Sequence, residues 1–339
     1  MSRSVTDKKI LRRTAALAVT GILLLVSVFV CVGIGSVKFT LSEVVRALFC
    51  DDASTAHLLI MNLRLPRILC CCTVGICLSL SGCILQSVMR NTMASPSTIG
   101  VTGGASFAGY LMLCALPGLS RYLPVGSIIG AFVTTMLIYA LAYRRGVSPV
   151  RMILSGLAVS ALFGALNDAI RTFFADSLGN VSGFLVGGFN GCSWDSFFMI
   201  LPFTVVGVTV CAFLPSAMNI LMLGDETAAS LGLRTELFRF VLIVVSSLLS
   251  GAAIAVCGLI GFVGLIVPHI SRLIVGSDHR WLMPMSSMLG ALLLVVCDTV
   301  GRVIMPPGEV PVSIILSLIG APFFLWLLRS KDNSIGGES

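Results

Sequence analysis

Apolar stretches long enough to cross a lipid bilayer follow one another along nearly the whole chain. A helix needs about 20 apolar residues to cross a hydrocarbon core of about 30 Å. The candidate spans are 15–37, 68–89, 98–119, 122–143, 149–171, 196–214, 237–257, 258–274, 283–303 and 311–328. Only 11% of the residues are charged, whereas an average soluble domain has about 25%. The sequence therefore predicts an all-α integral membrane protein with about ten transmembrane helices in a single domain, residues 1–339.

The longest uncharged run, residues 240–271, decides the topology because it is overlong for one span. Gly258, Gly261 and Gly264, followed by Pro268, favour a break and a short return helix. The cytoplasmic loops of membrane proteins carry an excess of Lys and Arg. In this chain the excess is larger if there are ten spans than if the seventh and eighth spans form one helix. The sequence therefore predicts ten spans with both termini in the cytoplasm.

Basic residues between Lys8 and Arg13 precede the first apolar run, 15–37. This run is longer than a typical signal-peptide core and no small-residue cleavage site follows it, so we expect a retained first span. Cytoplasmic tails are expected at 1–14 and 330–339. The net charge of +7 is scattered at the ends of apolar runs. That pattern is typical of a membrane protein and not of a nucleic-acid-binding surface.

The reactive side chains form no pattern typical of a metal site or an enzyme. The twelve cysteines lie mostly inside apolar runs without a C-x-x-C pair, which indicates small apolar fillers, although Cys50 and Cys192 fall in or near outer loops. His57, His269 and His279 lack a metal-ligand spacing. The sequence G-x-x-x-x-G-K-[ST] is absent, so we expect no ATP site and no directly bound cofactor in this chain.

A short polar segment separates the sixth and seventh spans. Leu223 to Gly232 is expected to form a helix of about two turns, with Asp225 as its N-cap and Gly232 as the left-handed residue that ends it. The segment is too short and too polar to cross a bilayer. Residues 214–236 are therefore predicted to lie on the cytoplasmic surface.

Two further patterns concern packing. Small residues are dense in the second and seventh spans, for example Gly75, Gly82 and Gly251, and they predict faces on which helices approach closely. Residues 177–194 are uncharged and rich in Gly, Ser and Asn. We expect them to form either a short helix and loop on the outer rim or an ordinary loop.

An ordered set of motifs resembles the FecCD-type permeases of bacterial ABC importers for ferric siderophores, haem and cobalamin. The motifs are Arg64-Leu65-Pro66-Arg67, the stretch around Arg90-Asn91, Met218-Asn219-Ile220-Leu221, Gly224-Asp225-Glu226, the run from Gly258 to Arg272, Asp278-His279-Arg280 and Gly320-Ala321-Pro322-Phe323-Phe324. The resemblance implies a BtuC-like type II ABC importer permease fold in the bacterial cell membrane. It also implies ABC ATPase subunits, an extracytoplasmic substrate-binding protein and a second permease copy or paralogue as partners.

The resemblance assigns roles to two groups of inner residues. The residues expected to engage the ATPase are Gly224, Asp225, Glu226, Ala228, Ala229, Leu231 and Gly232. Asn91, Ser148 and Pro149 are expected in the inner gate by the same resemblance. Asn167 is a candidate for lining the pathway because it is a polar residue within the fifth span.

Three arginines lie at the predicted outer ends of spans, against the usual preference for basic residues inside. Arg64 and Arg67 are three apart at the start of the second span, and Arg302 follows Asp298 by four residues. One interpretation is interfacial snorkelling together with an intrahelical pair between Asp298 and Arg302. The other, supported by the resemblance, is that all three arginines dock carboxylates of the binding protein, since a guanidinium can hold a carboxylate bidentately.

The favoured function is the permease subunit of an ATP-driven importer for a metal chelate, with ferric siderophore ahead of haem and cobalamin. A secondary transporter driven by ions is the first alternative, but Asp168 and Asp298 lie toward the outer face and not near the midplane, where such transporters place carboxylates. Asp168 is expected to pair with Arg171 instead. An intramembrane enzyme is the second alternative, but the sequence shows no pattern of a nucleophile with a base or of metal ligands.

Overall fold

The computed structural model describes residues 2–35, 37, 39–49, 54–144, 146, 148–175, 182–306 and 308–335. The first half contains α1 (Ser2–Gly33), α2 (Leu41–Phe49), α3 (Thr55–Leu59), η1 (Ile60–Arg64), α4 (Leu65–Val88), α5 (Val101–Tyr110), η2 (Leu111–Ala115), η3 (Pro117–Tyr122), α6 (Leu123–Ala142) and α7 (Pro149–Phe173). The second half contains α8 (Ser182–Val186), α9 (Trp194–Phe213), α10 (Pro215–Leu221), α11 (Asp225–Ser230), α12 (Thr235–Cys257), α13 (Val263–Val275), α14 (His279–Ile304) and α15 (Val312–Ile335).

The helices confirm the predicted spans. Within the described residues, seven helices are long and apolar enough to cross a membrane, and three shorter apolar helices cover Val101–Ala115, Val263–Val275 and Val312–Trp326. Each of them coincides with one predicted span. The first helix is longer than its apolar run, because α1 begins at Ser2 and continues through the basic segment.

The predicted division of the long uncharged run is also confirmed. α12 ends at Cys257 and α13 begins at Val263. Gly258 has a φ of 70°, and a Cβ at this position would lie 2.1 Å from the carbonyl oxygen of Phe184, so only glycine fits. Gly264 and Pro268 lie inside the return helix α13, so the break itself is formed by residues 258–262.

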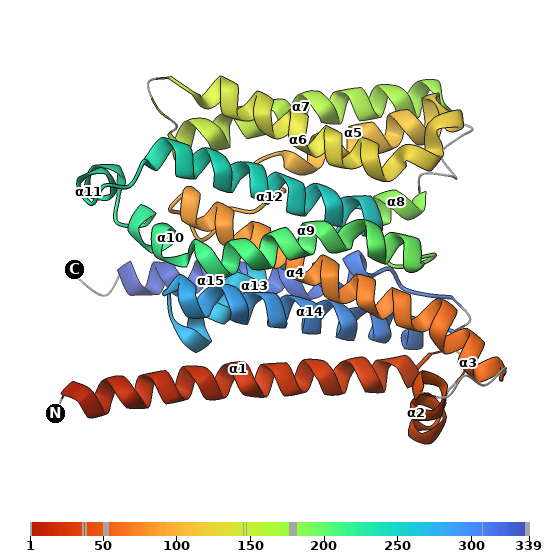
Figure 1. Ribbon diagram of the computed structural model, residues 1–339. Coiled ribbons are helices and arrows are strands. Elements are labelled where there is room, and N and C mark those ends of the chain that lie inside the picture. The colour runs from red at the N-terminus through yellow and green to blue at the C-terminus, as the bar shows by residue number, and fades with distance from the viewer. Residues whose placement is uncertain are drawn as a thin grey trace.

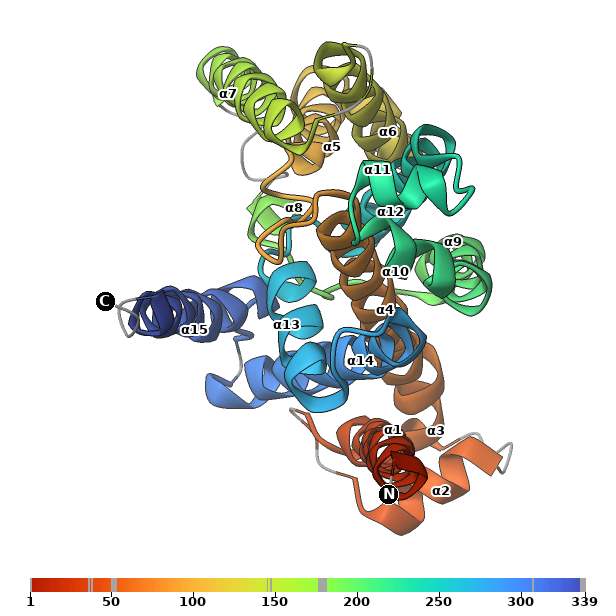
Figure 2. The ribbon, with the colours of Figure 1, turned by 90° about the vertical axis from the view of Figure 1, so that its left-hand side faces the viewer.

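The centre of the bundle is α4, which packs against α9, α12, α13 and α14 (Figure 2). Its small residues allow very close contacts: a Cβ on Gly75 would lie 2.3 Å from the carbonyl oxygen of Gly290, and one on Gly82 would lie 1.9 Å from that of Gly264. Close backbone approach replaces the hydrophobic effect as the source of helix association in lipid. The packed faces predicted from the small residues are therefore confirmed for α4.

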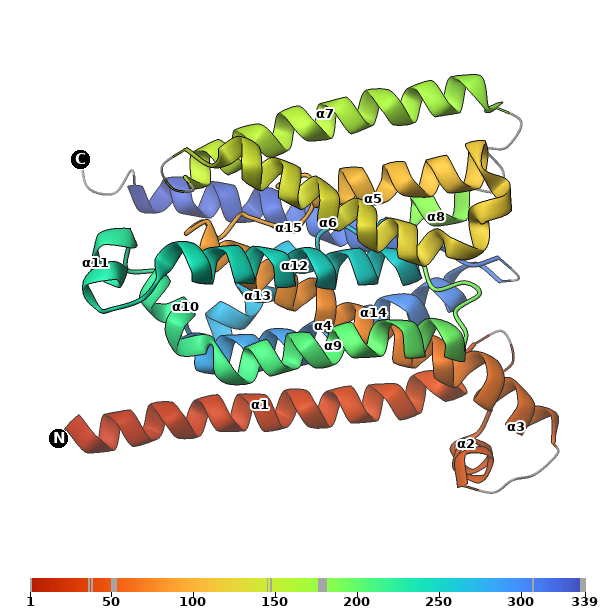
Figure 3. The same cartoon turned by 45° about the horizontal axis from the view of Figure 1, so that its top comes forward.

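The two ends of the bundle differ in the short helices they carry (Figures 1 and 3). α10, α11 and both ends of the chain lie at one end, which we name the α11 end; α2, α3 and α8 lie at the other, the α8 end. α8 confirms a short helix within residues 177–194, and the amide of Leu259 donates to its Phe184 carbonyl over 3.1 Å. Residues 177–181, Cys50 and the last four positions of the predicted 330–339 tail lie outside the described residues.

Candidate functional site

The surface helix α11 begins and ends as a separate unit between α10 and α12. The prediction that Asp225 is its N-cap is wrong, because Gly224 occupies that position with a φ of 107° and Asp225 is the first helical residue. The predicted end is confirmed: Gly232 has a φ of 84°, its amide donates to Ala229 over 2.9 Å, and the amide of Leu233 donates to Ala228 over 3.0 Å. This pair of bonds is the Schellman motif that glycine favours.

The Asp225 carboxylate ties α11 to the bundle. One oxygen accepts from Arg239 of α12 over 2.6 Å, and the other lies 3.5 Å from Arg90 in the connection between α4 and α5. Arg239 is 1% exposed and also contacts Glu236 over 3.1 Å. A buried guanidinium is stable only when carboxylates and hydrogen bonds compensate its lost hydration. The position of α11 is therefore set by a charge inside the bundle.

The residues expected to engage an ATPase separate into two groups. Ala228 is fully buried and packs α11 onto the bundle, as Asp225 does through its carboxylate. The side chains of Glu226, Ala229 and Leu231 are exposed, with Leu231 59% accessible. One side of α11 thus holds the helix in place, and the other presents a mixed apolar and acidic surface to its surroundings.

The connection between α4 and α5 holds Asn91, one of the predicted gate residues. Arg90 has a φ of 48°, and the Asn91 side chain accepts from the amide of Met93 over 2.9 Å. The hydroxyls of Ser95 and Thr98 cap each other's backbone amides over 2.8 and 3.2 Å. The Asn91 side chain therefore stabilises this turn.

The other two gate positions and Asn167 lie on or beside α7. Ser148 precedes the helix in extended conformation and Pro149 is its first residue, which suits proline because that position needs no amide donor. Asn167 lies toward the opposite end of α7, where its amide donates to Ser106 over 3.2 Å. The structure therefore does not bring Asn167 together with Ser148 and Pro149.

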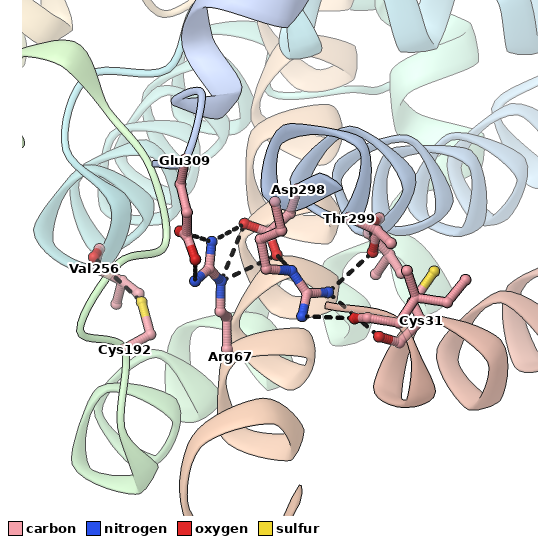
Figure 4. A network of polar contacts seen from close by, with 10 residues as sticks. Cys31, Arg67, Cys192, Val256, Asp298, Thr299 and Glu309 are labelled. Atoms are coloured by element: carbon pink, nitrogen blue, oxygen red, sulfur yellow. Dashed lines mark hydrogen bonds and ion pairs between the residues drawn. The ribbon is translucent and has the colours of Figure 1, made fainter. Parts of the chain in front are cut away.

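At the α8 end, a buried carboxylate joins two of the predicted docking arginines (Figure 4). Asp298 is 1% exposed, accepts a hydrogen bond from Arg67 over 2.8 Å and forms an ion pair with the Nε atom of Arg302 at 3.2 Å. Glu309 binds the other side of Arg67 over 2.9 Å and is 32% exposed. The predicted intrahelical pair of Asp298 and Arg302 is confirmed, and the alternating charges form one network. The pair of Asp168 and Arg171 is also confirmed, at 3.7 Å.

Arg64 belongs to a different environment from Arg67, although the sequence places them on one helical face. The π-helical turn η1 contains Arg64, whereas Arg67 is inside α4. Arg64 donates to the carbonyls of Val32 and Gly33 over 2.9 and 3.1 Å. Its guanidinium lies 4.7 Å from the ring centroid of Phe39. Arg64 thus ties the end of α1 to the start of the second span, and it still lines one hollow together with Arg67.

Two hollows flank the pair of Arg67 and Glu309. One of about 290 Å³ lies beside Asp298 and the loop from Gly187 to Asn190, and one of about 260 Å³ lies beside Arg64 and Arg302. Arg67 is the most accessible of the three arginines, at 16%, compared with 9% for Arg64 and 7% for Arg302. Arg67 is consequently the arginine of the three that reaches the surface most, next to the partly exposed Glu309.

His279 is the first residue of α14 and is 2% exposed. Its ring contacts Asn219 of α10 over 2.7 Å and Ser87 of α4 over 2.5 Å. Asn219 and His279 belong to two of the motifs that carry the family resemblance, but their spacing along the chain gave no sign that they touch. Among the described residues, no group of three or more His, Cys, Asp or Glu side chains is arranged to hold a metal ion.

Comparisons with known proteins agree with this architecture. A model of the FecCD transport family matches residues 23–330. The iron(3+)-hydroxamate import permease FhuB of Bacillus subtilis is 38% identical over 92% of this chain and 82% of its own length. The cobalamin import permease BtuC of Halobacterium salinarum is 39% identical over 82% of this chain and 75% of its own. An inward-facing structure described as a metal-chelate type ABC transporter aligns with a TM-score of 0.81 and 31% identity, covering 93% of this chain and 98% of that one.

Proposed function

The chain belongs to the FecCD transport family, and from this membership we propose that it imports a ferric siderophore as the membrane-spanning permease subunit of an ATP-driven importer. Iron(3+)-hydroxamate and Fe(3+)-citrate permeases among its relatives support this cargo class. The observation that carries the mechanism is α11, a surface helix with one exposed side and one side anchored by Asp225 to the buried Arg239. The similarity to a cobalamin permease keeps cobalamin, and with it haem, as a second candidate cargo.

The proposal places the α11 end in the cytoplasm. Glu226, Ala229 and Leu231 then face a separate ABC ATPase, which supplies hydrolysis because this chain carries no P-loop sequence. A second permease copy or a paralogue completes the pathway. Both tails, 1–14 and 330–339, and the coupling region 214–236 lie on the cytoplasmic side.

Asp225 transmits movement of α11 into the bundle by two routes. The bond to Arg239 moves α12, and the contact with Arg90 reaches the turn that contains Asn91. Displacement of α11 by the ATPase is opposed by loss of pairing at the buried guanidinium of Arg239, whereas the contact with Arg90 is longer and partly exposed and contributes less. Helix α11 therefore moves together with α12 and with the turn that contains Asn91.

The α8 end receives the binding protein. Arg64, Arg67 and Arg302 supply the positive charge, and the exposed Glu309 occupies Arg67 before docking. A carboxylate on the binding protein replaces Glu309 on the same guanidinium, while Asp298 keeps Arg67 and Arg302 in position. Exchange of one carboxylate for another preserves the charge balance of the network, so docking avoids leaving an unpaired arginine.

The direct test is uptake by proteoliposomes that contain this chain, its ATPase and its binding protein. We expect accumulation of ferric siderophore that needs ATP on the α11 side and binding protein on the α8 side. Accumulation driven by a proton or sodium gradient without ATP would overturn the proposal. The same assay with cobalamin and haem separates the candidate cargoes.

A further inference from the structure

A groove separates the start of α1 from the start of α14 at the α11 end of the bundle, where the two helices lie side by side (Figure 2). It has a volume of about 490 Å³ and is lined by Ile10, Arg13, Leu17, Asp278, Arg280 and Trp281. The transport role proposed above uses none of these side chains. The groove combines two guanidinium groups with apolar walls, which is an unusual lining for a surface exposed to water alone.

The depth of the groove matches the boundary between hydrocarbon and headgroups. Arg13 stands two residues before the apolar run that starts at Ala15. Its guanidinium lies 6.0 Å from the ring centroid of Trp281, in the first turn of α14. Tryptophan is enriched at this boundary, and arginine there can reach the phosphate layer while its stem stays in the apolar region. Leu17 lies one helical turn deeper, on the hydrocarbon side.

The charge of the groove favours an anion. The Asp278 carboxylate is already engaged, since it accepts from the Asn219 amide over 2.8 Å and from the backbone amide of Arg280 over 3.1 Å. Arg280 contacts the Ser216 hydroxyl over 3.2 Å. The negative charge of Asp278 acts on both Arg13 and Arg280 and offsets part of their charge, so two guanidinium groups against one carboxylate leave the groove with one net positive charge. The exposed basic residues Lys8, Lys9 and Arg12 on neighbouring turns of α1 add to the positive field.

We propose that this groove binds an anionic phospholipid. The headgroup phosphate lies between Arg13 and Arg280, and an acyl chain runs past Leu17 along the seam between α1 and α14. Basic pockets between transmembrane helices recognise anionic headgroups through such charge pairs. The lipid also bridges α1, most of which faces away from the bundle, to the segment of α14 that contacts α10. Only the assignment to the cytoplasmic leaflet rests on the proposed orientation; binding itself is independent of transport.

The test uses Trp281 as the reporter in the full-length protein. Trp194→Phe and Trp326→Phe leave Trp281 as the single tryptophan, and chain-brominated phosphatidylglycerol and phosphatidylcholine are compared as quenchers in mixed vesicles. We expect phosphatidylglycerol to bind next to Trp281 roughly fivefold or more in preference to phosphatidylcholine, the effect of about one additional cationic contact. Equal binding of the two lipids would overturn the proposal.

Two variants locate the charge. In the double variant Arg13→Gln/Arg280→Gln, phosphatidylglycerol and phosphatidylcholine should bind next to Trp281 almost equally. The matched control Arg12→Gln removes an exposed charge one position away and should retain the preference for phosphatidylglycerol. An equal loss in the control would mean a diffuse surface field and no site. Displacement of phosphatidylglycerol by millimolar inorganic phosphate would mean a free-anion site and would also overturn the lipid assignment.

A measurement on the unsubstituted protein covers the case in which the variants do not fold. Native mass spectrometry of the full chain, released from micelles that contain equal amounts of both lipids, should show phosphatidylglycerol retained in preference to phosphatidylcholine by a similar factor. Retention without preference would contradict the proposal even if no variant could be purified.

Discussion

The two ends of the bundle carry the same kinds of charged group in opposite arrangements. At the α11 end a buried arginine, Arg239, is paired with the partly exposed carboxylates of Asp225 and Glu236. At the α8 end a buried carboxylate, Asp298, is paired with Arg67 and Arg302. The buried charge is therefore a guanidinium at the α11 end and a carboxylate at the α8 end. At the α8 end Arg67, 16% exposed, links the buried Asp298 to the more exposed Glu309.

This difference suits the two ends to different tasks. Removing one partner of a buried pair leaves an uncompensated charge, so Arg239 holds α11 rigidly and suits transmission of force. Arg67 keeps Asp298 as a permanent partner while Glu309 is the replaceable one, which suits reversible docking. The predictions below test this contrast, from the largest expected effect to the smallest.

Asp298→Ala should cause the largest loss of stability, because Arg67 and Arg302 would lose the carboxylate that they share. Leaving a buried charge without its partner costs about 3–5 kcal/mol. Thermal unfolding of the purified protein in detergent measures the effect. The matched control is Asp168→Ala, which removes an exposed carboxylate 3.7 Å from Arg171 and should change stability by about 1 kcal/mol or less. Equal losses in the two variants would contradict the contrast between buried and exposed pairs.

Asp225→Ala should uncouple transport from hydrolysis. A hydrogen bond to a charged group contributes about 1.5–3 kcal/mol, so we expect siderophore uptake per ATP hydrolysed to fall about tenfold or more in proteoliposomes. Arg90→Ala should lower the same ratio less, because its contact with Asp225 is longer, at 3.5 Å. If both residues act through one contact, the double variant should resemble Asp225→Ala, and additive losses would show separate routes.

Ala229→Glu should disturb the exposed side of α11 without unfolding the helix, since position 229 is accessible. A carboxylate pressed into the interface with the ATPase loses hydration, so we expect uptake to fall several-fold while the melting temperature of the isolated permease stays unchanged. Ala229→Ser is the conservative control and should keep uptake. Normal uptake with the glutamate would argue against contact between this face and the ATPase.

Glu309→Gln should have the smallest effect, and in the opposite direction. Loss of the competing carboxylate frees Arg67, so the binding protein should dock more tightly. The expected gain is about twofold to fivefold, because the pair is partly exposed and screened by salt. Surface plasmon resonance with nanodiscs gives the affinity, and Arg67→Gln provides the comparison that should weaken docking. Weaker docking of Glu309→Gln would mean that Glu309 supports the interface.

Periodicity and composition sufficed for most of the fold. The ten apolar segments and the glycine break at residue 258 were predicted because membrane thickness and backbone satisfaction leave a helix few alternatives. The end of α11 at Gly232 was predicted because its local geometry needs only one left-handed residue. The N-cap of α11 was predicted wrongly, because the Asp225 carboxylate pairs with Arg239, fourteen residues later in the chain.

What the sequence alone determined is the list of helices, the position of the return helix and the presence of a polar helix between the sixth and seventh spans. These features depend on neighbouring residues and on the thickness of the bilayer. Only the tertiary structure decided the partners of the charged side chains: Arg64 with the end of α1, Arg67 with Asp298 and Glu309, and Arg239 with Asp225. The physical reason is that a long charged side chain pairs with an opposite charge that lies near it in the packed bundle. The distance between the two charges is set by helix packing and not by their separation along the chain.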